Sequence, residues 1–544
     1  MAKDRLKVIP LGGLGEIGKN MLALELGGDI IAIDCGLMFP KEEMLGVDLV
    51  IPDISYLQER KDRLRGIIIT HGHEDHTGAL PYVLPKLDVP VYATALTRGL
   101  IQAKLKEHGV KARLEVVRPG AEVRLGAFRV RFYQVSHSIP DAVGLIIHTP
   151  LGTIVHSGDF KLDHTPVDGR PTDLSRLAQA GTEGVLLLFS DSTYVELPGY
   201  TPSEKVVGET LDRIMAEAPG RVIITTFASL VSRTQQVLWS AARHGRKVFV
   251  LGRSMQDTVK IATKLKYLEI PPGTLGQLEE LPGLPLPKVV LLTTGSQGEP
   301  TSALVRIARG DHPRVRILAG DTVVISASPV PGNEALVNRT INALFRLGAR
   351  VLYDKLAQVH VHGHGSQEEL KLLINLVRPK YFVPIHGEYR HLSLHASLAQ
   401  SLGMPKENTI VLEDGDTLEI GPRGGLVMEH LPIGSIYVDG LGGVGPVVLR
   451  DRQSLAQDGV VMVILTRERR SGRLVGRPDV VSRGFVEEKE WQALAERSRD
   501  LLARQLGHGR IEGLVQDRVK DVLGRFFYQE THRQPMVLPV VVEV

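Results

Sequence analysis

The run His-Gly-His-Glu-Asp-His at residues 71–76 concentrates metal-binding side chains within a short stretch of the chain. Imidazole and carboxylate groups are the ligands expected for Zn²⁺ or Mn²⁺. His71 and His73 cannot share one face of a helix, because residues two positions apart point in different directions there. We therefore expect a loop at a strand end, in which His71 and His73 hold one ion while Asp75 and His76 hold a second.

Two ions held in this way would support hydrolysis. Ions about 3.5–4 Å apart can share a bridging hydroxide, lower its pKa towards about 7 and stabilise an in-line displacement at phosphorus. A single histidine is more often an ordinary hydrogen-bonded residue, but the density of ligands in this run favours metal. The sequence thus predicts a two-metal hydrolase.

Closing two metal sites requires further ligands from elsewhere in the chain. Three candidates lie just past predicted strands: His137 in Val-Ser-His-Ser, Asp159 in His-Ser-Gly-Asp, and His386 in Pro-Ile-His-Gly. Each would be unremarkable alone, and only the 71–76 run makes it a candidate ligand.

A second histidine cluster, His-Val-His-Gly-His-Gly-Ser at residues 360–366, precedes a predicted helix at 367–377. The N-terminal N–H groups of a helix suit a phosphate, so we predict that this segment binds one. A third metal site or a glycine-rich turn is the alternative interpretation. His362 would titrate near neutrality there and make phosphate binding depend on pH.

Two other motifs have weaker interpretations. The run Gly-Leu-Gly-Glu-Ile-Gly at 13–18 matches the dinucleotide-binding fingerprint, but residues 20–33 predict a hairpin where that fingerprint needs a helix. NAD binding is therefore disfavoured. The arginine-rich stretch 467–473 could contact RNA, although a solvated hairpin is the favoured interpretation.

The elements that must position these residues change character along the chain. Short strands dominate residues 1–201, whereas strands and helices alternate regularly over residues 202–350, which is typical of parallel βαβ units in a separate domain. Strands return over residues 351–438. The metal ligands must therefore come from a domain that an insertion interrupts.

The last part of the chain is predicted to form a separate α+β unit. A glycine-rich linker is expected at 439–455 and the unit itself at 456–544, with helices at 487–506 and 511–528. Apolar residues of the second helix form one stripe, which predicts a core. These residues are Ile511, Leu514, Val515, Val519, Val522, Leu523 and Phe526.

Composition sets broad limits on partners and location. The length of 544 residues favours several structural units, and the net charge of +3 leans only weakly towards anionic partners. The single cysteine, Cys35, excludes an internal disulfide and a cysteine-based zinc finger. Neither a signal peptide nor a run of about 18 apolar residues is found, so a cytoplasmic protein without a membrane partner is expected.

The pattern His-x-His-x-Asp-His followed by single His, Asp and His ligands resembles the metallo-β-lactamase superfamily, and in particular its β-CASP branch, which processes nucleic acids. Within that branch the chain is similar to the bacterial ribonuclease J family over about residues 6–397. The likeness rests on Gly-Leu-Met-Phe-Pro at 36–40, Leu-Gly-Val-Asp at 45–48, Ser-Gly-Asp-Phe-Lys at 157–161, Thr-Phe-Ala-Ser at 226–229, Gly-His-Gly-Ser at 363–366 and Pro-Ile-His-Gly-Glu-Tyr at 384–389.

This resemblance implies the fold: a metallo-β-lactamase αββα sandwich with an inserted β-CASP α/β domain and a small α+β C-terminal domain. It also implies a role for each candidate residue. One metal would be bound by His71, His73 and His137, the other by Asp75, His76 and His386, with Asp159 bridging them and Asp34 orienting the ligand loop. Asp75 would orient the hydroxide, and His364, backed by Asp191, would protonate the leaving oxygen. Substrate phosphate would be held by Ser229, His360, Val361, His362, Gly363 and His364.

The activity that the resemblance implies is a metal-dependent ribonuclease in mRNA decay and rRNA processing. Such an enzyme would use two Zn²⁺ or Mn²⁺ ions, with Mg²⁺ as a further option, to trim single-stranded RNA from a 5′-monophosphate end and also to cut it internally. The resemblance further implies a homodimer formed through the C-terminal domain and possible partners in an RNA-degradation complex.

Three other functions stay open at this point. A β-CASP nuclease could act on DNA or on RNA 3′ ends. A small-molecule metallo-hydrolase would have no use for the 202–350 insertion. A non-catalytic scaffold subunit of an RNA-processing complex would be expected to lose metal ligands, and this chain keeps the full set.

Overall fold

The computed structural model describes residues 5–41, 43–330, 332–421, 424–440, 442–470, 473–506 and 515–544. The chain divides into two compact units. The first comprises Met1–Phe39 and Val50–Ser435, and the second comprises Pro40–Leu49 and Ile436–Val544. Among the described residues, no helix is long and apolar enough to cross a membrane.

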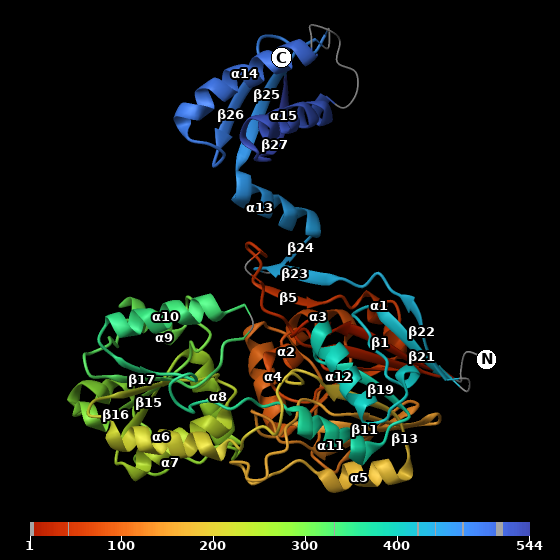
Figure 1. Cartoon of the computed structure of the whole chain (residues 1–544), viewed down its shortest axis with the longest axis vertical. Helices are drawn as coiled ribbons and strands as arrows, with labels where there is room; N and C mark the ends of the chain where they lie inside the picture. Colours follow the sequence, from red (N-terminus) through yellow and green to blue (C-terminus); the bar gives the residue numbers. More distant parts are fainter. Residues whose placement is uncertain are drawn as a thin grey trace. The chain divides into compact units, whose positions relative to one another are not determined.

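Two sheets form the centre of the first unit (Figure 1). Strand residues such as Leu24, Phe132 and Leu187 point between the sheets and share one hydrophobic core, because side chains on alternate positions of a strand face the same side. The first sheet runs in the order β22 (Gly424–His430), β21 (Asp416–Gly421), β1 (Leu6–Gly12), β3 (Met21–Leu26), β4 (Asp29–Ile33), β6 (Leu64–Ile68), β7 (Val91–Ala93) and β8 (Leu114–Val116). The second runs in the order β19 (Tyr381–Ile385), β13 (Val185–Asp191), β12 (Gly152–His156), β11 (Val143–Thr149), β10 (Phe128–Gln134) and β9 (Glu122–Leu125).

Helices cover the outer faces of both sheets and complete four layers. Helices α5 (Leu174–Glu183), α11 (Gln367–Val377) and α12 (Tyr389–Ser401) share a core with the second sheet. Helix α4 (Ala95–Glu107) packs on β7 and β8 of the first sheet and on α3 (Leu80–Leu87), which in turn packs on α1 (Ser55–Gln58). The arrangement is the predicted αββα sandwich.

A third sheet, the inserted sheet, is formed by residues that lie between β13 and β19 in the sequence. All its neighbouring strands are parallel, in the order β15 (Lys247–Leu251), β16 (Val289–Thr293), β14 (Val222–Thr225), β17 (Thr322–Ile325) and β18 (Arg350–Leu352). Helices α6 (Lys205–Glu217), α7 (Val231–Arg243) and α8 (Arg253–Lys264) cover one face, and α9 (Ala303–Arg309) and α10 (Glu334–Arg346) cover the other. This inserted sheet explains the strand–helix alternation of the sequence.

The inserted sheet is joined to the sandwich by direct packing. Helix α4 of the sandwich packs on α8 of the insertion, and the Tyr267 hydroxyl donates to Asp141 at 2.7 Å. Both parts thus belong to one compact unit.

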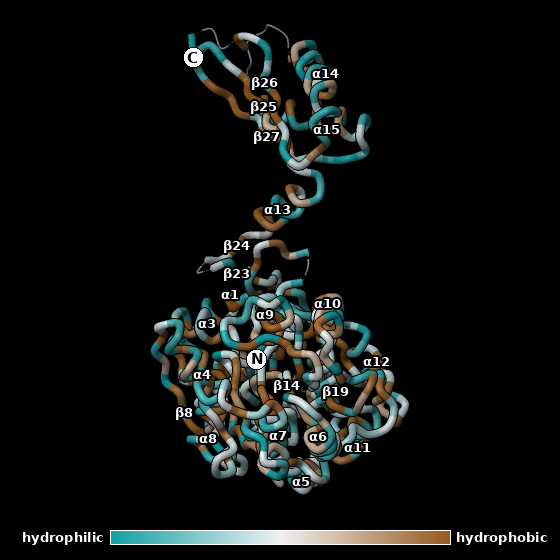
Figure 2. Tube along the Cα trace, turned by 90° about the vertical axis from the view of Figure 1, so that its left-hand side faces the viewer, coloured by the Kyte–Doolittle hydropathy of each residue, from teal (hydrophilic) through white to brown (hydrophobic). Residues whose placement is uncertain are grey.

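The second unit has its own core. Its sheet runs in the order β26 (Asp479–Arg483), β25 (Val460–Arg467) and β27 (Met536–Glu543), and α14 (Glu488–Leu506) and α15 (Val515–Thr531) pack on one face of it. In Figure 2 hydrophobic stretches run along these strands. Val515, Val519 and Phe526 of the predicted helical stripe lie on α15, whereas Ile511 and Leu514 lie outside the described residues.

Two stretches show how local sequence can mislead. The predicted linker at 439–455 holds the strand β24 (Gly442–Val444), which pairs with β23 (Ser435–Asp439), and most of helix α13 (Pro446–Asp458). This helix shows no amphipathic stripe in the sequence: Leu449 is buried, whereas Val447 is 61% exposed and Leu455 42%. In the arginine-rich stretch an antiparallel bridge joins Arg467 to Leu474, while Ser471 and Gly472 lie outside the described residues.

Candidate metal centre

The ligand loop at 69–77 leaves strand β6 and enters the short helix α2 (Glu74–Thr77). A neighbouring loop after β4 fixes it through backbone hydrogen bonds: Cys35 N–H donates to the His76 carbonyl at 2.8 Å, and Leu37 N–H donates to the Glu74 carbonyl at 3.0 Å. Contact is so close at Gly36 that a Cβ there would lie 1.6 Å from the Asp75 carbonyl oxygen. Only glycine fits at this position.

Three imidazoles form the first candidate ligand group. Nδ1 of His73 lies 3.0 Å from Nε2 of His71 and 3.2 Å from Nε2 of His137. His137 joins this group from the loop after β10, and its Nδ1 donates to the Gly363 carbonyl at 2.8 Å. That hydrogen bond leaves Nε2 of His137 free to face the other two rings.

The second candidate group is formed by Asp75, His76, Asp159 and His386, whose ligand atoms lie within 4.8 Å of one another. Nε2 of His386 lies 3.4 Å from Oδ2 of Asp75. Oδ2 of Asp159 lies 3.1 Å from Nε2 of His76, 3.6 Å from Nε2 of His71 and 3.9 Å from Nε2 of His137. One carboxylate oxygen therefore faces nitrogens of both groups.

Asp34 lies behind the candidate ligands and contacts the ring of His76. Nδ1 of His76 donates to Oδ2 of Asp34 at 2.8 Å, and the backbone N–H of Thr70 donates to Oδ1 at 2.8 Å. This bond turns Nε2 of His76 towards Asp159.

The protonation of these groups fits a cation. Burial, followed by the neighbouring His76, lowers the pKa of His71 well below its usual value, and burial lowers the pKa of His73 to about 4, so both are neutral. Burial opposes a charge on His386, but Asp159 outweighs it and raises the His386 pKa. Its Nε2 is buried without a hydrogen-bond partner. The neutral imidazoles of the first group match the donor set of a divalent metal. Burial also opposes a charge on His76, but Asp159 and Asp75 outweigh it and raise the His76 pKa, so His76 and His386 hold protons that a bound metal ion would displace.

A third group adjoins the other two through Asp159 and His386 and contains Asp191 and His364. Nδ1 of His364 donates to Oδ2 of Asp191 at 2.7 Å, while the Thr193 hydroxyl donates to Oδ1 at 2.7 Å. Burial alone would lower the pKa of His364, but Asp191 raises it above the ordinary value. His364 can therefore hold a proton beside the candidate metal ligands.

The predicted use of the α11 N-terminus for phosphate is wrong. The N–H groups of Gln367 and Glu368 already donate to the carbonyls of Leu197 and Gly199, at 3.0 and 3.1 Å, and Ser366 caps Glu369. The free donors lie in the preceding loop: within the described chain, residues 360–365 donate no backbone hydrogen bond. A phosphate there would be held by loop N–H groups and not by a helix end.

The expectation that His362 titrates near neutrality is also wrong. Burial, with the nearby His364, lowers the pKa of His362 to about 4. The ring stacks on Tyr194 with centroids 3.8 Å apart, and its Nδ1 donates to the His364 carbonyl at 2.9 Å. His362 is therefore neutral over the physiological range, and its single N–H is used on the His364 carbonyl, which leaves Nε2 as an acceptor.

The start of this segment is anchored to the inserted sheet. The buried guanidinium of Arg233 donates to the Ser326 and Val359 carbonyls at 3.3 and 2.9 Å. Burial, followed by the Arg233 charge, lowers the pKa of His360 to about 3. Val361 is buried, whereas Ser229 lies in the loop between β14 and α7 and its hydroxyl makes no hydrogen bond within the described chain. These contacts place His360 but do not test the predicted role of Ser229.

Asn20 was missed by sequence reasoning. Its side-chain amide donates to the Asp75 carbonyl at 3.1 Å and lies 3.2 Å from Nε2 of His76. The preceding glycines allow this approach, since a Cβ at Gly13 would lie 2.2 Å from Oδ1 of Asn20. The same glycine run joins antiparallel strands β1 and β3 instead of a strand and a helix. Read as a close-packing signal, it would have pointed to Asn20.

Family models match nearly the whole chain. The metallo-β-lactamase superfamily matches residues 14–217, and the β-CASP domain of ribonuclease J matches residues 219–344. A Zn-dependent metallo-hydrolase RNA specificity domain matches residues 349–411, and the ribonuclease J C-terminal domain matches residues 447–544.

Curated relatives match over the full length. The chain is 44% identical to Ribonuclease J of Thermus thermophilus, covering 99% of this chain and 96% of the relative. It is 42% identical to Ribonuclease J 1 of Streptococcus pyogenes and to Ribonuclease J2 of Bacillus subtilis, covering 99% of this chain and 98% and 99% of those relatives. A solved structure of a protein of unknown function from Enterococcus faecalis shares the fold at 16% identity, with a TM-score of 0.55 over 80% of this chain and 100% of that one.

Proposed function

Because this chain belongs to the ribonuclease J family, we propose that it is a metal-dependent ribonuclease that hydrolyses the phosphodiester bonds of single-stranded RNA. The observation that carries the proposal is the position of Asp159, whose Oδ2 faces the His71 and His137 nitrogens on one side and His76 on the other. We assign His71, His73 and His137 to one divalent ion, Asp75, His76 and His386 to the other, and Asp159 to both.

The surrounding residues supply orientation and a proton. Two divalent ions held by these groups would supply Lewis-acid charge and lower the pKa of a water. Asp34 fixes the ring of His76, and Asp75 would orient the attacking water. His364 keeps its proton because Asp191 holds Nδ1, so Nε2 can donate to the leaving oxygen.

We propose that the loop at 360–365, with Ser229 on the insertion side, holds the 5′-phosphate of RNA. The loop adjoins the first ligand group, since His137 donates to the Gly363 carbonyl. Its free N–H groups can bind one phosphate, whereas a triphosphate would overfill the space. The enzyme would therefore degrade RNA from 5′-monophosphate ends, and also cut internally where no end is bound, in the decay and maturation of cytoplasmic mRNA and rRNA.

The test is degradation of 5′-monophosphate and 5′-triphosphate RNA by the wild type, His76→Ala and the exposed-residue control His164→Ala. We expect the wild type and the control to release mononucleotides from the first RNA and little from the second, and His76→Ala to be inactive. Full activity of His76→Ala would refute the metal assignment. Equal degradation of both RNAs by the wild type would refute the 5′-phosphate site.

The identity of the ions is a separate proposal. The mixed imidazole and carboxylate donors accept Zn²⁺ and Mn²⁺ alike, with Mg²⁺ less suited to imidazole. Elemental analysis of the gently purified protein should find about two equivalents of Zn²⁺ or Mn²⁺ per chain. Less than one equivalent would instead support a non-catalytic scaffold.

We propose that the second unit supports a homodimer. The sheet face turned away from α14 and α15 exposes apolar side chains that a second copy would cover. They include Met462 (39% exposed), Leu538 (44%), Val540 (37%) and Val542 (43%). Light scattering should show that Leu538→Glu with Val540→Glu dissociates the dimer, while Glu530→Gln, on the helical side, does not.

We also propose domain limits that follow the sequence expectation: 1–201 and 351–438 for the sandwich, 202–350 for the insertion, and 456–544 for the C-terminal domain. The strand order supports a separate insertion, but β18 (Arg350–Leu352) belongs to the inserted sheet and crosses the limit at 350, and the segment Pro40–Leu49 groups with the second unit. Limited proteolysis should cut first near residues 439–445.

A further inference from the structure

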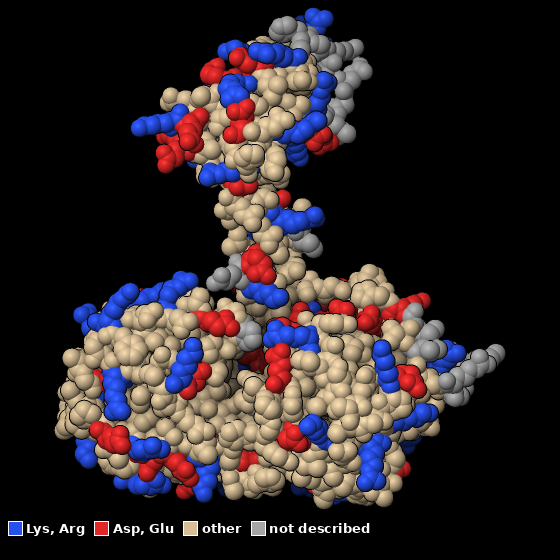
Figure 3. All heavy atoms as spheres, viewed as in Figure 1, with Lys and Arg blue, Asp and Glu red and all other residues tan. Residues whose placement is uncertain are grey.

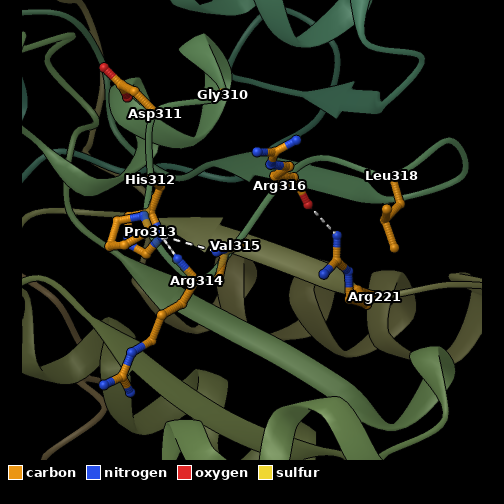
Figure 4. A pocket seen from close by; sticks show the side chains of 9 residues that line it. All are labelled: Arg221, Gly310, Asp311, His312, Pro313, Arg314, Val315, Arg316 and Leu318. Atoms are coloured by element: carbon orange, nitrogen blue, oxygen red, sulfur yellow. Dashed lines mark hydrogen bonds between the residues drawn. The ribbon is translucent and has the colours of Figure 1, made fainter.

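A pocket of about 480 Å³ lies at the edge of the inserted sheet where its strands begin (Figure 4). Arg221 immediately precedes β14, and the chain from Gly310 to Leu318 runs before β17. The opposite edge, where β17 ends, leads through Ser326 and Arg233 to the phosphate-binding loop. Ligands of open α/β sheets usually bind beyond the carboxyl ends of the strands. This pocket is therefore separate from the site described above.

Arg221 is held rigidly in the pocket wall. Its Nε donates to Oδ1 of Asp321 at 2.9 Å, and its Nη2 donates to Oδ2 of Asp321 at 2.5 Å and to the Arg316 carbonyl at 2.7 Å. The residue is only 7% exposed. Its Nη1 makes no hydrogen bond within the described chain and is left as a donor without a protein partner.

Two further donors line the same pocket. Nδ1 of His312 accepts the N–H groups of Arg314 and Val315, at 3.3 and 3.1 Å, so the ring hydrogen of the neutral imidazole must be on Nε2. The Arg316 side chain forms no ion pair and no hydrogen bond with any described residue. Nε2 of His312, the Arg316 guanidinium and Nη1 of Arg221 are therefore donors without a hydrogen-bond partner among the described residues.

Acidic side chains pair with two of the three arginines at the pocket and leave Arg316 unpaired among the described residues. Asp311 is the acidic residue among those lining the pocket, and Figure 4 shows its carboxylate pointing away from Arg221 and Arg316. Arg314 is neutralised by Glu279 at 2.8 Å. On the same part of the molecule, Figure 3 shows Lys and Arg side chains gathered over α9 and α10. Asp321 offsets the charge of Arg221, so an anion entering the pocket would meet the unpaired positive charge of Arg316 and the free N–H donors of Arg221 and His312.

We propose that this pocket binds a phosphate group through Arg221, His312 and Arg316. A tetrahedral oxyanion offers several acceptor oxygens, and guanidinium and imidazole N–H groups are its preferred donors. The phosphate belongs either to the backbone of an RNA strand outside the cleavage site or to a free phosphate or small phosphate ester. An RNA backbone and a free phosphate offer the same acceptor oxygens, and binding experiments can distinguish them.

The test compares the full-length wild type with Arg316→Gln/His312→Gln and with the control Arg339→Gln. Arg339 is exposed on α10, pairs with no described residue and does not line the pocket, so the control removes a charge from the same domain. Titration calorimetry with inorganic phosphate measures binding, and crystals soaked in tungstate show where the anion lies. Fluorescence anisotropy of a labelled 5′-hydroxyl RNA measures its binding to the same proteins, each carrying His76→Ala so that the RNA is not cleaved.

We expect tungstate in the pocket of the wild type and the control, and phosphate binding there weakened about tenfold or more in the double variant. If RNA affinity and its salt dependence fall as well, the source is the RNA backbone; if RNA affinity is unchanged, the source is a free phosphate. An empty pocket in wild-type crystals, or phosphate affinity equal in all three proteins, overturns the proposal. Cleavage of a short RNA by the same substitutions in the active chain should stay at the wild-type level, which shows that they fold. Phosphate binding in the calorimeter does not depend on RNA cleavage at the metal site. The proposed phosphate pocket and the proposed ribonuclease activity can therefore be refuted independently.

Discussion

The side-chain amide of Asn20 lies 3.2 Å from Nε2 of His76 and donates to the Asp75 carbonyl at 3.1 Å, although Asn20 is outside the histidine run. Asn20→Ala should lower metal affinity and cleavage by about tenfold, because neighbours that orient ligands typically contribute that much. Competition with a chromophoric chelator measures the affinity. Asn20→Asp, which places a carboxylate oxygen beside Nε2, should retain metal. An equal loss of metal affinity in both variants would show that Asn20 contributes only through packing.

Asp34 gives a second test of ligand orientation. Its Oδ2 accepts the Nδ1 proton of His76, so Asp34→Ala should free the ring and weaken metal binding by about 10–100-fold. Metal content after dialysis against a weak chelator measures the effect. Asp62→Ala, an exposed aspartate in the same unit, is the matched control and should keep its metal.

Gly36 should tolerate no side chain. A Cβ there would lie 1.6 Å from the Asp75 carbonyl oxygen, so Gly36→Ala must displace the ligand loop at a cost of about 1–3 kcal/mol or more. A Cβ at Gly434 would have no atom within 4 Å, so Gly434→Ala should leave the free energy of unfolding nearly unchanged. Urea unfolding of both variants measures the cost, and similar midpoints would contradict the close contact.

The neutral state of His362 predicts a flat pH profile. Its pKa of about 4 lies well below the ordinary value, so the ring gains no charge between about pH 6 and about pH 8. RNA affinity of His362→Ser should therefore show the same pH dependence as the wild type over that range. In contrast, His364→Gln should lose any dependence near neutrality, because the pKa of His364 is raised. An inflection that only the His362 substitution removes would be inconsistent with the buried, neutral ring.

Buried neutral histidines predict acid sensitivity. Burial lowers the pKa of His395 to about 3, so the folded protein keeps the ring neutral while the unfolded chain protonates it below about pH 6.5. The stability that His395 contributes is complete above the unfolded pKa and declines as pH falls towards the folded one. From about pH 7.5 to about pH 5.5 the loss is on the order of 1 kcal/mol for this group. His395→Gln should lose that much less over the same range in urea unfolding, and an identical loss would count against the assignment.

Much of the architecture could be predicted because local pattern controls it. The alternation of strands and helices from residue 202 reflects a parallel sheet whose strands β15 and β16 coincide with the apolar runs of the sequence. Helix α13 could not be predicted, because Val447 and Leu455 are exposed and leave no buried stripe.

The sequence by itself determined the chemistry available to this protein. The spacing of His71, His73, Asp75 and His76 places their ligand atoms on one short loop, and that follows from chain geometry alone. Pattern also supplied His137, Asp159 and His386 as candidates, since residues just past strand ends converge at a sheet edge.

Only the tertiary structure decided how these groups act on one another. It brought Asp159 between two ligand groups, joined His364 to Asp191 across 173 positions of sequence, and gave the α11 N–H groups to Leu197 and Gly199 instead of a phosphate. It also buried His362 and so removed its charge near neutrality. The physical reason is that hydrogen-bond partners and desolvation depend on what packs around a side chain, and those neighbours come from segments far apart in the sequence.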